Sequence, residues 1–244
     1  MHKILSVLLF LTLLHNGQAT ATVTKPLSIT ASSWLVADSD GNIIESENIN
    51  QQRSIASITK LMTAMVVLDA GQDLDQYIKP YTRREMLQLA IVRSDNNASE
   101  LLCQHYPGGR SRCVQAMNEK AQKLGMYNSR FIDPTGLGVM NASTALDLIK
   151  LVKAAENYQE IVHASRMSEV KIKIRKKYLI FKNTNPIIGK RHDFIISKTG
   201  WITASGGCIV MMLDTDIGRR IVVVLGSKNT HTRIPEAEFI ATKQ

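Results

Sequence analysis

The sequence contains little that would support metal or cofactor chemistry. It has three cysteines and six histidines in 244 residues, and they form neither a zinc-type spacing nor a His-Glu-x-x-His motif. We therefore expect no metal and no cofactor, and a metallopeptidase is disfavoured. The net charge of +9 favours polyanionic partners, but no nucleic-acid-binding motif accompanies it, so we expect no nucleic acid partner.

The odd number of cysteines leaves at least one thiol unpaired. Cys103 and Cys113 flank a Pro-Gly-Gly loop between two helical patterns, where a disulfide could form in an oxidising compartment. Spacing alone does not establish the required geometry, so their pairing stays open. Cys208 lies in an apolar run and is interpreted as a packed core thiol.

Long hydrophobic runs are absent beyond the first residues. A lysine, an apolar stretch over 4–14 and small residues at Ala19 and Ala21 are typical of a secretory signal, and the stretch is too short to span a bilayer. We expect residues 1–21 to be a cleaved signal peptide and residues 22–244 to form one exported, periplasmic domain. The mature chain would lose Lys3 and no acid, leaving a net charge of +8.

The order of periodic patterns predicts an α+β fold. Alternating residues around an Asp-Gly-Asn turn predict an N-terminal hairpin over 32–50, and strand signals return after residue 168. Helical patterns fill the middle of the chain, at about 57–71, 82–92, 97–106, 111–124 and 143–156, and a short helix is expected near the end. The hairpin and three later strands are expected to form one antiparallel sheet.

A serine three residues before a lysine opens the first helical pattern, at Ser57 and Lys60. One helical turn separates them, so they share a face, and helix-start N–H groups favour negative charge on the serine oxygen. Two interpretations stay open for this motif alone: a helix cap with a solvated lysine, or a nucleophile with its base. A second copy at Ser168 and Lys171 falls in a strand pattern, which would place its side chains on opposite faces.

Two further segments favour the catalytic interpretation. Ser94-Asp95-Asn96 falls in a loop between helices, and Lys198-Thr199-Gly200 falls at the end of a strand. Ser-x-x-Lys, Ser-Asp-Asn and Lys-Thr-Gly in this order form the motif set of penicillin-binding proteins and class A β-lactamases.

The chemistry of acyl transfer explains these residue types. Serine is a weak nucleophile, so Ser57 needs a base, and Lys60 can serve if burial and the positive charge of Lys198 lower its pKa. We hypothesise that Ser94 relays the proton to the leaving nitrogen and that Asn96 holds a substrate amide. Four residues at the strand end complete the predicted site, in which the N–H groups of Ser57 and Trp201 form the oxyanion hole, Gly200 permits close approach of the strand, and Lys198 and Thr199 bind the substrate carboxylate.

From about residue 33 to 226 the sequence resembles the low-molecular-mass penicillin-binding proteins, the D-Ala-D-Ala serine peptidases. The resemblance includes the segments HYPGG, FIDPTGL, NASTALDL and ASGGCIV as well as the three motifs. It is strongest to the D-alanyl-D-alanine endopeptidase branch, the penicillin-binding protein 7 group. It implies a monomeric periplasmic hydrolase without a stable membrane anchor, whose substrates are peptidoglycan peptides with D-alanyl to diaminopimelyl cross-links and whose covalent inhibitors are β-lactams.

The sequence departs from this family pattern in three places. The connection over 74–86 is short, as though a hairpin beside the cleft were absent. Ile202 stands where relatives often have threonine, and the segment KIKIRKKY is unusually basic, which fits either a solvated strand face or a grip on anionic wall polymer.

Three alternatives to an endopeptidase remain at this stage. A D-Ala-D-Ala carboxypeptidase would use the same residues. A β-lactamase would need a deacylating carboxylate, for which Glu156 and Glu160 are available without a matching loop motif. A catalytically inactive peptidoglycan-binding module would retain the fold alone.

Overall fold

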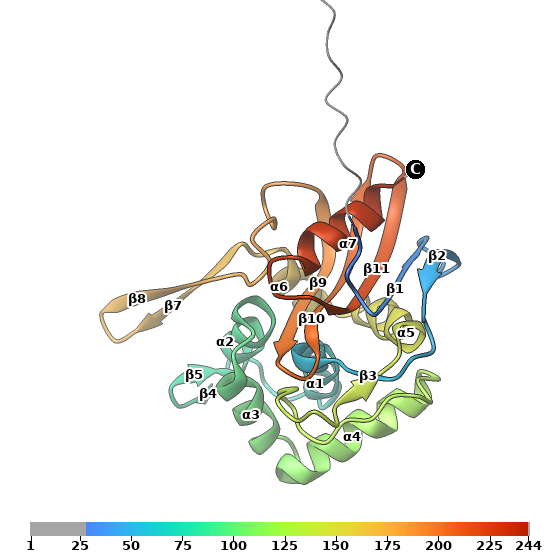
Figure 1. Cartoon of the computed structure of the whole chain (residues 1–244). Helices are drawn as coiled ribbons and strands as arrows, with labels where there is room; N and C mark the ends of the chain where they lie inside the picture. The colour runs from blue at the N-terminus through green and yellow to red at the C-terminus, as the bar shows by residue number, and fades with distance from the viewer. Residues whose placement is uncertain (1–27, 244) are drawn as a thin grey trace, which may run out of the picture.

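A computed structural model describes residues 28–243 (Figure 1), so the predicted signal peptide over 1–21 lies outside the described residues. The central element is a five-stranded antiparallel sheet with the strand order β2-β1-β11-β10-β9. Its strands are β1 (Ser33–Ala37), β2 (Ile43–Glu47), β9 (Asp193–Ile202), β10 (Gly206–Thr215) and β11 (Gly218–Ser227). The N-terminal hairpin thus joins the three C-terminal strands, which confirms the predicted α+β fold and single main sheet.

Both faces of the sheet are covered. One face packs on the large core formed with the central helices, and the other packs on the C-terminal helix (Figure 1). Strand β10 shows the division most clearly, because Cys208, Val210 and Met212 enter the large core while Ile209 and Met211 enter the smaller one. Burial on both faces explains why this strand reads as a continuous apolar run.

The helices follow the predicted order. They are α1 (Thr59–Asp69), α2 (Arg83–Gln88), α3 (Asn96–Gln104), α4 (Gly109–Lys123), α5 (Ala145–Ala155), α6 (Gln159–Arg166) and α7 (Arg233–Thr242), with a 3-10 turn η1 (Ala56–Ile58) before α1 and a π-helical turn η2 (Leu89–Arg93) after α2. Helix α6 is the one that the sequence did not predict. Helix α1 is buried on nearly every side, from Thr59 to Val67.

Three small two-stranded sheets complete the fold. They are β3 (Arg53–Ser54) with β6 (Ala142–Ser143), β4 (Tyr77–Ile78) with β5 (Tyr81–Thr82), and β7 (Glu169–Ile174) with β8 (Lys177–Lys182). The β4–β5 pair lies within 74–86, so the expectation that no hairpin is present in this connection was wrong. The expectation rested on the shortness of this connection, but two strands of two residues each fit within it.

Two of the three cysteines form a disulfide, and the third is a free thiol. Cys103 and Cys113 form a disulfide that connects α3 with α4. Cys208 is a free thiol in the core, as predicted. Within residues 28–243, no helix combines the length and apolar character needed to cross a membrane.

Candidate active site

Ser57 and Lys60 are in direct contact at the junction of η1 and α1. The Nζ of Lys60 lies 2.9 Å from the Oγ of Ser57. Neither η1 nor α1 has a side-chain cap, so Ser57 does not cap the helix. The contact therefore rejects the cap interpretation and leaves the serine oxygen facing an amine.

Lys60 is buried completely, and its amine is held by three acceptors. Besides Ser57, it donates to Oδ1 of Asn96 at 2.8 Å and to the carbonyl oxygen of Thr135 at 2.5 Å. Burial lowers the pKa of Lys60 to about 7, against the opposing attraction of Asp133 and Asp95. A large fraction of this amine is therefore neutral near neutral pH and able to accept a proton.

Ser94 and Lys198 form a second pair. Ser94 ends η2 in the left-handed conformation, with φ 62° and ψ 35°, and its Oγ accepts a hydrogen bond from Nζ of Lys198 at 2.9 Å. Burial holds the pKa of Lys198 well below its usual value, and the positive charges of Lys60 and Arg233 lower it further. The sequence assigned part of the Lys60 shift to Lys198; in the structure burial is the main cause for both lysines.

The end of strand β9 lies directly against the nucleophile. A Cβ at Gly200 would lie 2.9 Å from the backbone nitrogen of Ser57 and 2.9 Å from the carbonyl oxygen of Ile55. Only glycine allows this approach. Strand β9 is at the edge of the sheet and packs beside η1, and the half-exposed Trp201 follows Gly200.

These contacts bring most of the predicted site residues into one linked group. Lys60 contacts Ser57 and Asn96, and Lys198 contacts Ser94, so all three sequence motifs meet around the start of α1. Thr199 is buried and donates to the Oγ1 of Thr184 at 2.7 Å. The described structure therefore assembles residues from the start, middle and end of the chain, as a composite active site requires.

A loop that the sequence analysis did not assign to the site positions a backbone acceptor for Lys60. The carboxylate of Asp133 accepts hydrogen bonds from the N–H groups of Thr135, Gly136 and Gly138 and from the Thr135 hydroxyl. These bonds hold the pKa of Asp133 below its usual value although burial opposes them. The loop then presents the Thr135 carbonyl to Lys60.

Gly136 fixes this loop against the nucleophile. Its φ is +82°, and a Cβ there would lie 1.9 Å from the carbonyl oxygen of Ala56, the residue before Ser57. Ala56 is itself at positive φ, 45°. The segment FIDPTGL was the available signal, since it formed part of the family resemblance, but nothing in its residues specified this contact.

Two more residues outside the motifs contact the Lys-Thr-Gly segment. Thr184 accepts the hydroxyl of Thr199, and Arg233, from the start of α7, donates to the carbonyl oxygen of Gly200 at 2.7 Å. Arg233 is buried, which brings a guanidinium close to Lys198. The sequence analysis assigned neither residue to the site, because no motif that it used links Thr184 to Thr199 or Arg233 to Gly200.

The two glutamates considered for a β-lactamase are engaged elsewhere. Glu156 accepts from Arg219 at 3.0 Å, and Glu160 accepts from Arg84 at 2.5 Å. Neither hydrogen-bonds to Ser57, Lys60 or Ser94 among the described residues.

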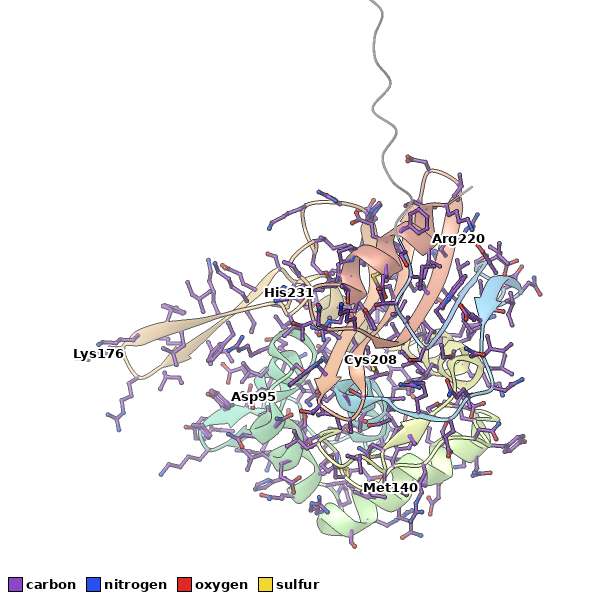
Figure 2. All side chains as sticks on the ribbon, viewed as in Figure 1. Asp95, Met140, Lys176, Cys208, Arg220 and His231 are labelled. Atoms are coloured by element: carbon purple, nitrogen blue, oxygen red, sulfur yellow. A yellow bond between two sulfur atoms is a disulfide. The ribbon has the colours of Figure 1, made fainter. Side chains whose placement is uncertain are left out.

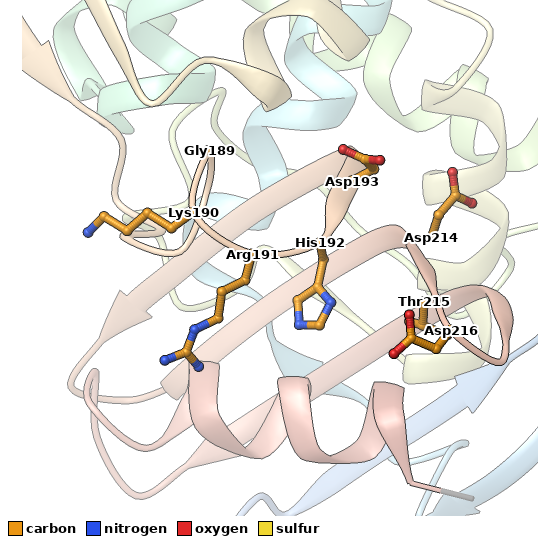
Figure 3. A pocket seen from close by; sticks show the side chains of 8 residues that line it. All are labelled: Gly189, Lys190, Arg191, His192, Asp193, Asp214, Thr215 and Asp216. Atoms are coloured by element: carbon orange, nitrogen blue, oxygen red, sulfur yellow. The ribbon is translucent and has the colours of Figure 1, made fainter.

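The hollow shown in Figure 3 is separate from this site. It has a volume of about 570 Å³ and is lined by Gly189–Asp193 and Asp214–Asp216, at the start of β9, whereas Lys198 and Gly200 are near its end. Asp193 and Asp214 face each other across the strands. Over residues 28–243, no cluster of histidine, cysteine and acidic side chains is placed to hold a metal ion.

Comparison with known proteins gives one family and one fold. The family model described as D-alanyl-D-alanine carboxypeptidase, peptidase S11, matches residues 19–80 and 76–229. A D-alanyl-D-alanine endopeptidase of Escherichia coli is 36% identical over 92% of this chain and 80% of its own length. Among solved structures, the DD-transpeptidase of Streptomyces K15 is 25% identical with a TM-score of 0.80, covering 89% of this chain and 97% of its own. The ampicillin-bound penicillin-binding protein D2 of Listeria monocytogenes is 23% identical with a TM-score of 0.78, covering 89% and 98%, and shows the same fold.

Proposed function

The chain belongs to the D-alanyl-D-alanine carboxypeptidase family, peptidase S11, and we propose that it is a penicillin-sensitive serine D-alanyl-D-alanine endopeptidase acting on peptidoglycan cross-links. The likeness to the Escherichia coli endopeptidase over most of both chains supports this activity. The observation that carries the proposal is the buried Lys60 amine, 2.9 Å from Ser57 Oγ with its pKa lowered to about 7.

The first step is acylation of Ser57. Its Oγ attacks the carbonyl carbon of the D-alanyl residue that forms the cross-link, while its proton passes to neutral Lys60. The oxyanion that forms is stabilised by the backbone N–H groups of Ser57 and Trp201. The closeness of Gly200 to the Ser57 nitrogen supports this pairing, because it brings the β9 end and η1 to the same point.

The second step breaks the peptide bond. The proton from Lys60 reaches the leaving nitrogen through the hydroxyl of Ser94, the C–N bond breaks, and the diaminopimelyl amine departs. An ester on Ser57 remains, and a water molecule then hydrolyses it, which returns the proton to Ser57. The hydrogen bond from Lys198 to Ser94 supports this role because it fixes the hydroxyl beside the cleft.

Substrate binding uses the remaining motif residues. The Oδ1 of Asn96 accepts from Lys60, so the Nδ2 group is the end that donates to a substrate carbonyl. Lys198 and Thr199 bind the substrate carboxylate. A bound carboxylate would favour the charged form of the buried Lys198 amine, whose pKa burial lowers, and the Thr199 hydroxyl can donate to the same anion.

β-Lactams enter the same reaction as covalent inhibitors. Their strained amide acylates Ser57, and the ester is released slowly because Glu156 and Glu160 are held by arginines instead of activating a water molecule. Stable labelling of Ser57 by a fluorescent penicillin is expected. Rapid turnover of the drug would favour a β-lactamase.

Digestion of purified cross-linked muropeptides, followed by mass spectrometry, tests the endopeptidase activity. Loss of cross-linked dimers is expected, with Ser57→Ala as the inactive control. Loss of one terminal alanine from uncross-linked peptides would instead indicate a carboxypeptidase, which the description of the family model keeps as the second candidate. Unchanged peptides together with retained sugar-peptide binding would indicate an inactive module.

The placement of the enzyme follows from the same proposal. Residues 1–21 serve as a cleaved leader, and residues 22–244 act as one monomeric catalytic domain in the periplasm, where cross-linked peptidoglycan is accessible. N-terminal sequencing of the exported protein measures the cleavage site, and light scattering measures the mass in solution. A retained leader or a stable dimer would contradict this part.

A further inference from the structure

The β7–β8 hairpin projects from the body of the molecule (Figure 1). It forms a two-stranded sheet of its own, so neither strand pairs with the main sheet. Near its base, Val170 and Ile172 are buried in the core, whereas the tip is exposed. The outer half of this arm is therefore not covered by any other part of the described chain.

The arm carries a large excess of positive charge. Over 169–182 there is a single acid, Glu169, which pairs with Lys171 at 3.3 Å. The other basic residues of the arm are Lys173, Arg175, Lys176, Lys177 and Lys182. None of these five takes part in a salt bridge within the described residues, and Figure 2 shows Lys176 at the far end of the hairpin.

Three consecutive large apolar side chains accompany the charges. Tyr178 is 65% exposed, Leu179 43% and Ile180 56%. The strand register pairs Tyr178 with Lys173 and Ile180 with Lys171, so these apolar and cationic side chains share one face. Leu179 is paired with Ile172 and lies on the opposite face. An exposed apolar group with a cationic border is typical of an interaction surface.

We propose that the tip of the β7–β8 hairpin binds the surface of an anionic phospholipid bilayer. Lysine and arginine pair with anionic headgroups, while the aromatic and aliphatic side chains enter the boundary between headgroups and acyl chains. An anionic wall polymer would satisfy the charges and leave Tyr178 and Ile180 in water. A second copy of the arm would place like charges against one another.

The base of the arm connects this surface to the active site. The backbone N–H of Thr184, just after β8, donates to the carbonyl oxygen of Val92 in η2, the turn that ends at Ser94. Thr184 also accepts the hydroxyl of Thr199. Contact at the tip therefore holds the cleft at a fixed position relative to the bilayer. This binding does not depend on which peptide bond the enzyme cleaves.

Sedimentation of the purified protein with vesicles tests the proposal. Vesicles of phosphatidylcholine containing about one third phosphatidylglycerol are compared with vesicles of phosphatidylcholine alone. Binding to the anionic vesicles is expected, weakening as salt rises. The charge variant Lys173→Glu with Lys176→Glu, and the apolar variant Tyr178→Ser with Ile180→Ser, should each lower this binding about tenfold or more.

Matched variants away from the arm serve as controls. Lys123→Glu with Lys190→Glu makes the same change of charge, and Ile44→Ser with Tyr127→Ser removes exposed apolar side chains elsewhere. Both should bind vesicles within about twofold of the unmodified protein. Labelling with a fluorescent penicillin should be unchanged in all four variants, which shows that the domain is folded.

Several results would overturn the proposal. Absence of binding to anionic vesicles is one, and equal loss in the control variants is another. If the charge variant loses binding while the apolar variant does not, the arm binds polyanions in general, and isolated cell wall should then compete. A change of mass in solution caused by the apolar variant would identify a second copy as the partner. If a double variant fails to label with penicillin, Lys176→Glu alone, in the turn, gives the same test with little risk to folding.

Discussion

Replacing Lys60 with methionine should stabilise the folded chain at neutral pH while it abolishes acylation. Lys60 is fully buried, and burial lowers its pKa from 10.5 to about 7. Between these two values the unfolded chain binds a proton at Lys60 and the folded chain does not. The free energy of unfolding therefore rises with pH across this window, by about 1.4 kcal/mol per pH unit, and near pH 7 the penalty against the folded state is about 4 kcal/mol.

Methionine removes this penalty but also removes the hydrogen-bonding partner of three groups. These are Ser57 Oγ, Asn96 Oδ1 and the carbonyl oxygen of Thr135. Because Ser57 and Asn96 are only partly buried and can bind water, the loss is about 2 kcal/mol. The variant should thus be more stable than the unmodified protein by about 2 kcal/mol near pH 7. Near pH 9.5 the penalty falls to about 1.4 kcal/mol, and the order should reverse.

Urea unfolding followed by tryptophan fluorescence, at several values between about pH 7 and pH 9.5, measures this difference. The exposed Lys123, changed to methionine, is the control and should show no such pH dependence. A stability difference between the Lys60→Met variant and the unmodified protein that stays constant with pH would refute the reasoning. It would mean that the folded and unfolded chains hold the Lys60 proton equally well.

Three shorter predictions concern acylation and its support. The rate of penicillin acylation should rise as pH increases through about 7, since neutral Lys60 accepts the proton; a flat rate would remove Lys60 from this role. Gly136→Ala should slow acylation about 100-fold or more, because its Cβ would lie 1.9 Å from the Ala56 carbonyl oxygen. Gly71 is also at positive φ but has open space around it, so Gly71→Ala should only lower the free energy of unfolding, by about 1 kcal/mol. Equal rates of acylation in the two variants would contradict the contact. Asp133→Asn should lower the free energy of unfolding in urea by about 2 kcal/mol, because an amide cannot accept all four hydrogen bonds; a loss below about 0.5 kcal/mol would show that the loop holds without them.

Much of the fold could be predicted because its strands and helices carry strong local patterns. The Asp-Gly-Asn turn indicated the N-terminal hairpin, and the apolar runs indicated β10 and β11. The prediction failed where the pattern is short or absent. Strands β4 and β5 have two residues each, and α6 has eight with charged residues close to its apolar ones.

The contacts of the candidate site also differ in how far they could be predicted from the sequence. Ser57 and Lys60 are one turn apart, so their contact follows from helix geometry alone. The meeting of Lys198 with Ser94 joins residues 104 positions apart, and only the order of the motifs indicated it. The contacts of the Thr135 carbonyl and of Arg233 could not be predicted from the sequence, because a backbone acceptor has no residue signature and a lone arginine has many possible partners.

The position of β1 within the sheet determines when the sheet can form. Strand β1 is the first strand in the sequence, yet it lies between β2 and β11 in the sheet, and β11 is the last strand of the described residues. A chain that is still being synthesised has an apolar β1 with no neighbour on one side. Strand β9, whose end lies against Ser57, is connected to β1 only through β10 and β11, so the sheet closes only when residues 218–227 are present. The order of the strands thus makes assembly of the catalytic site depend on pairing between the first and the last strand of the sheet, a contact of long sequence separation.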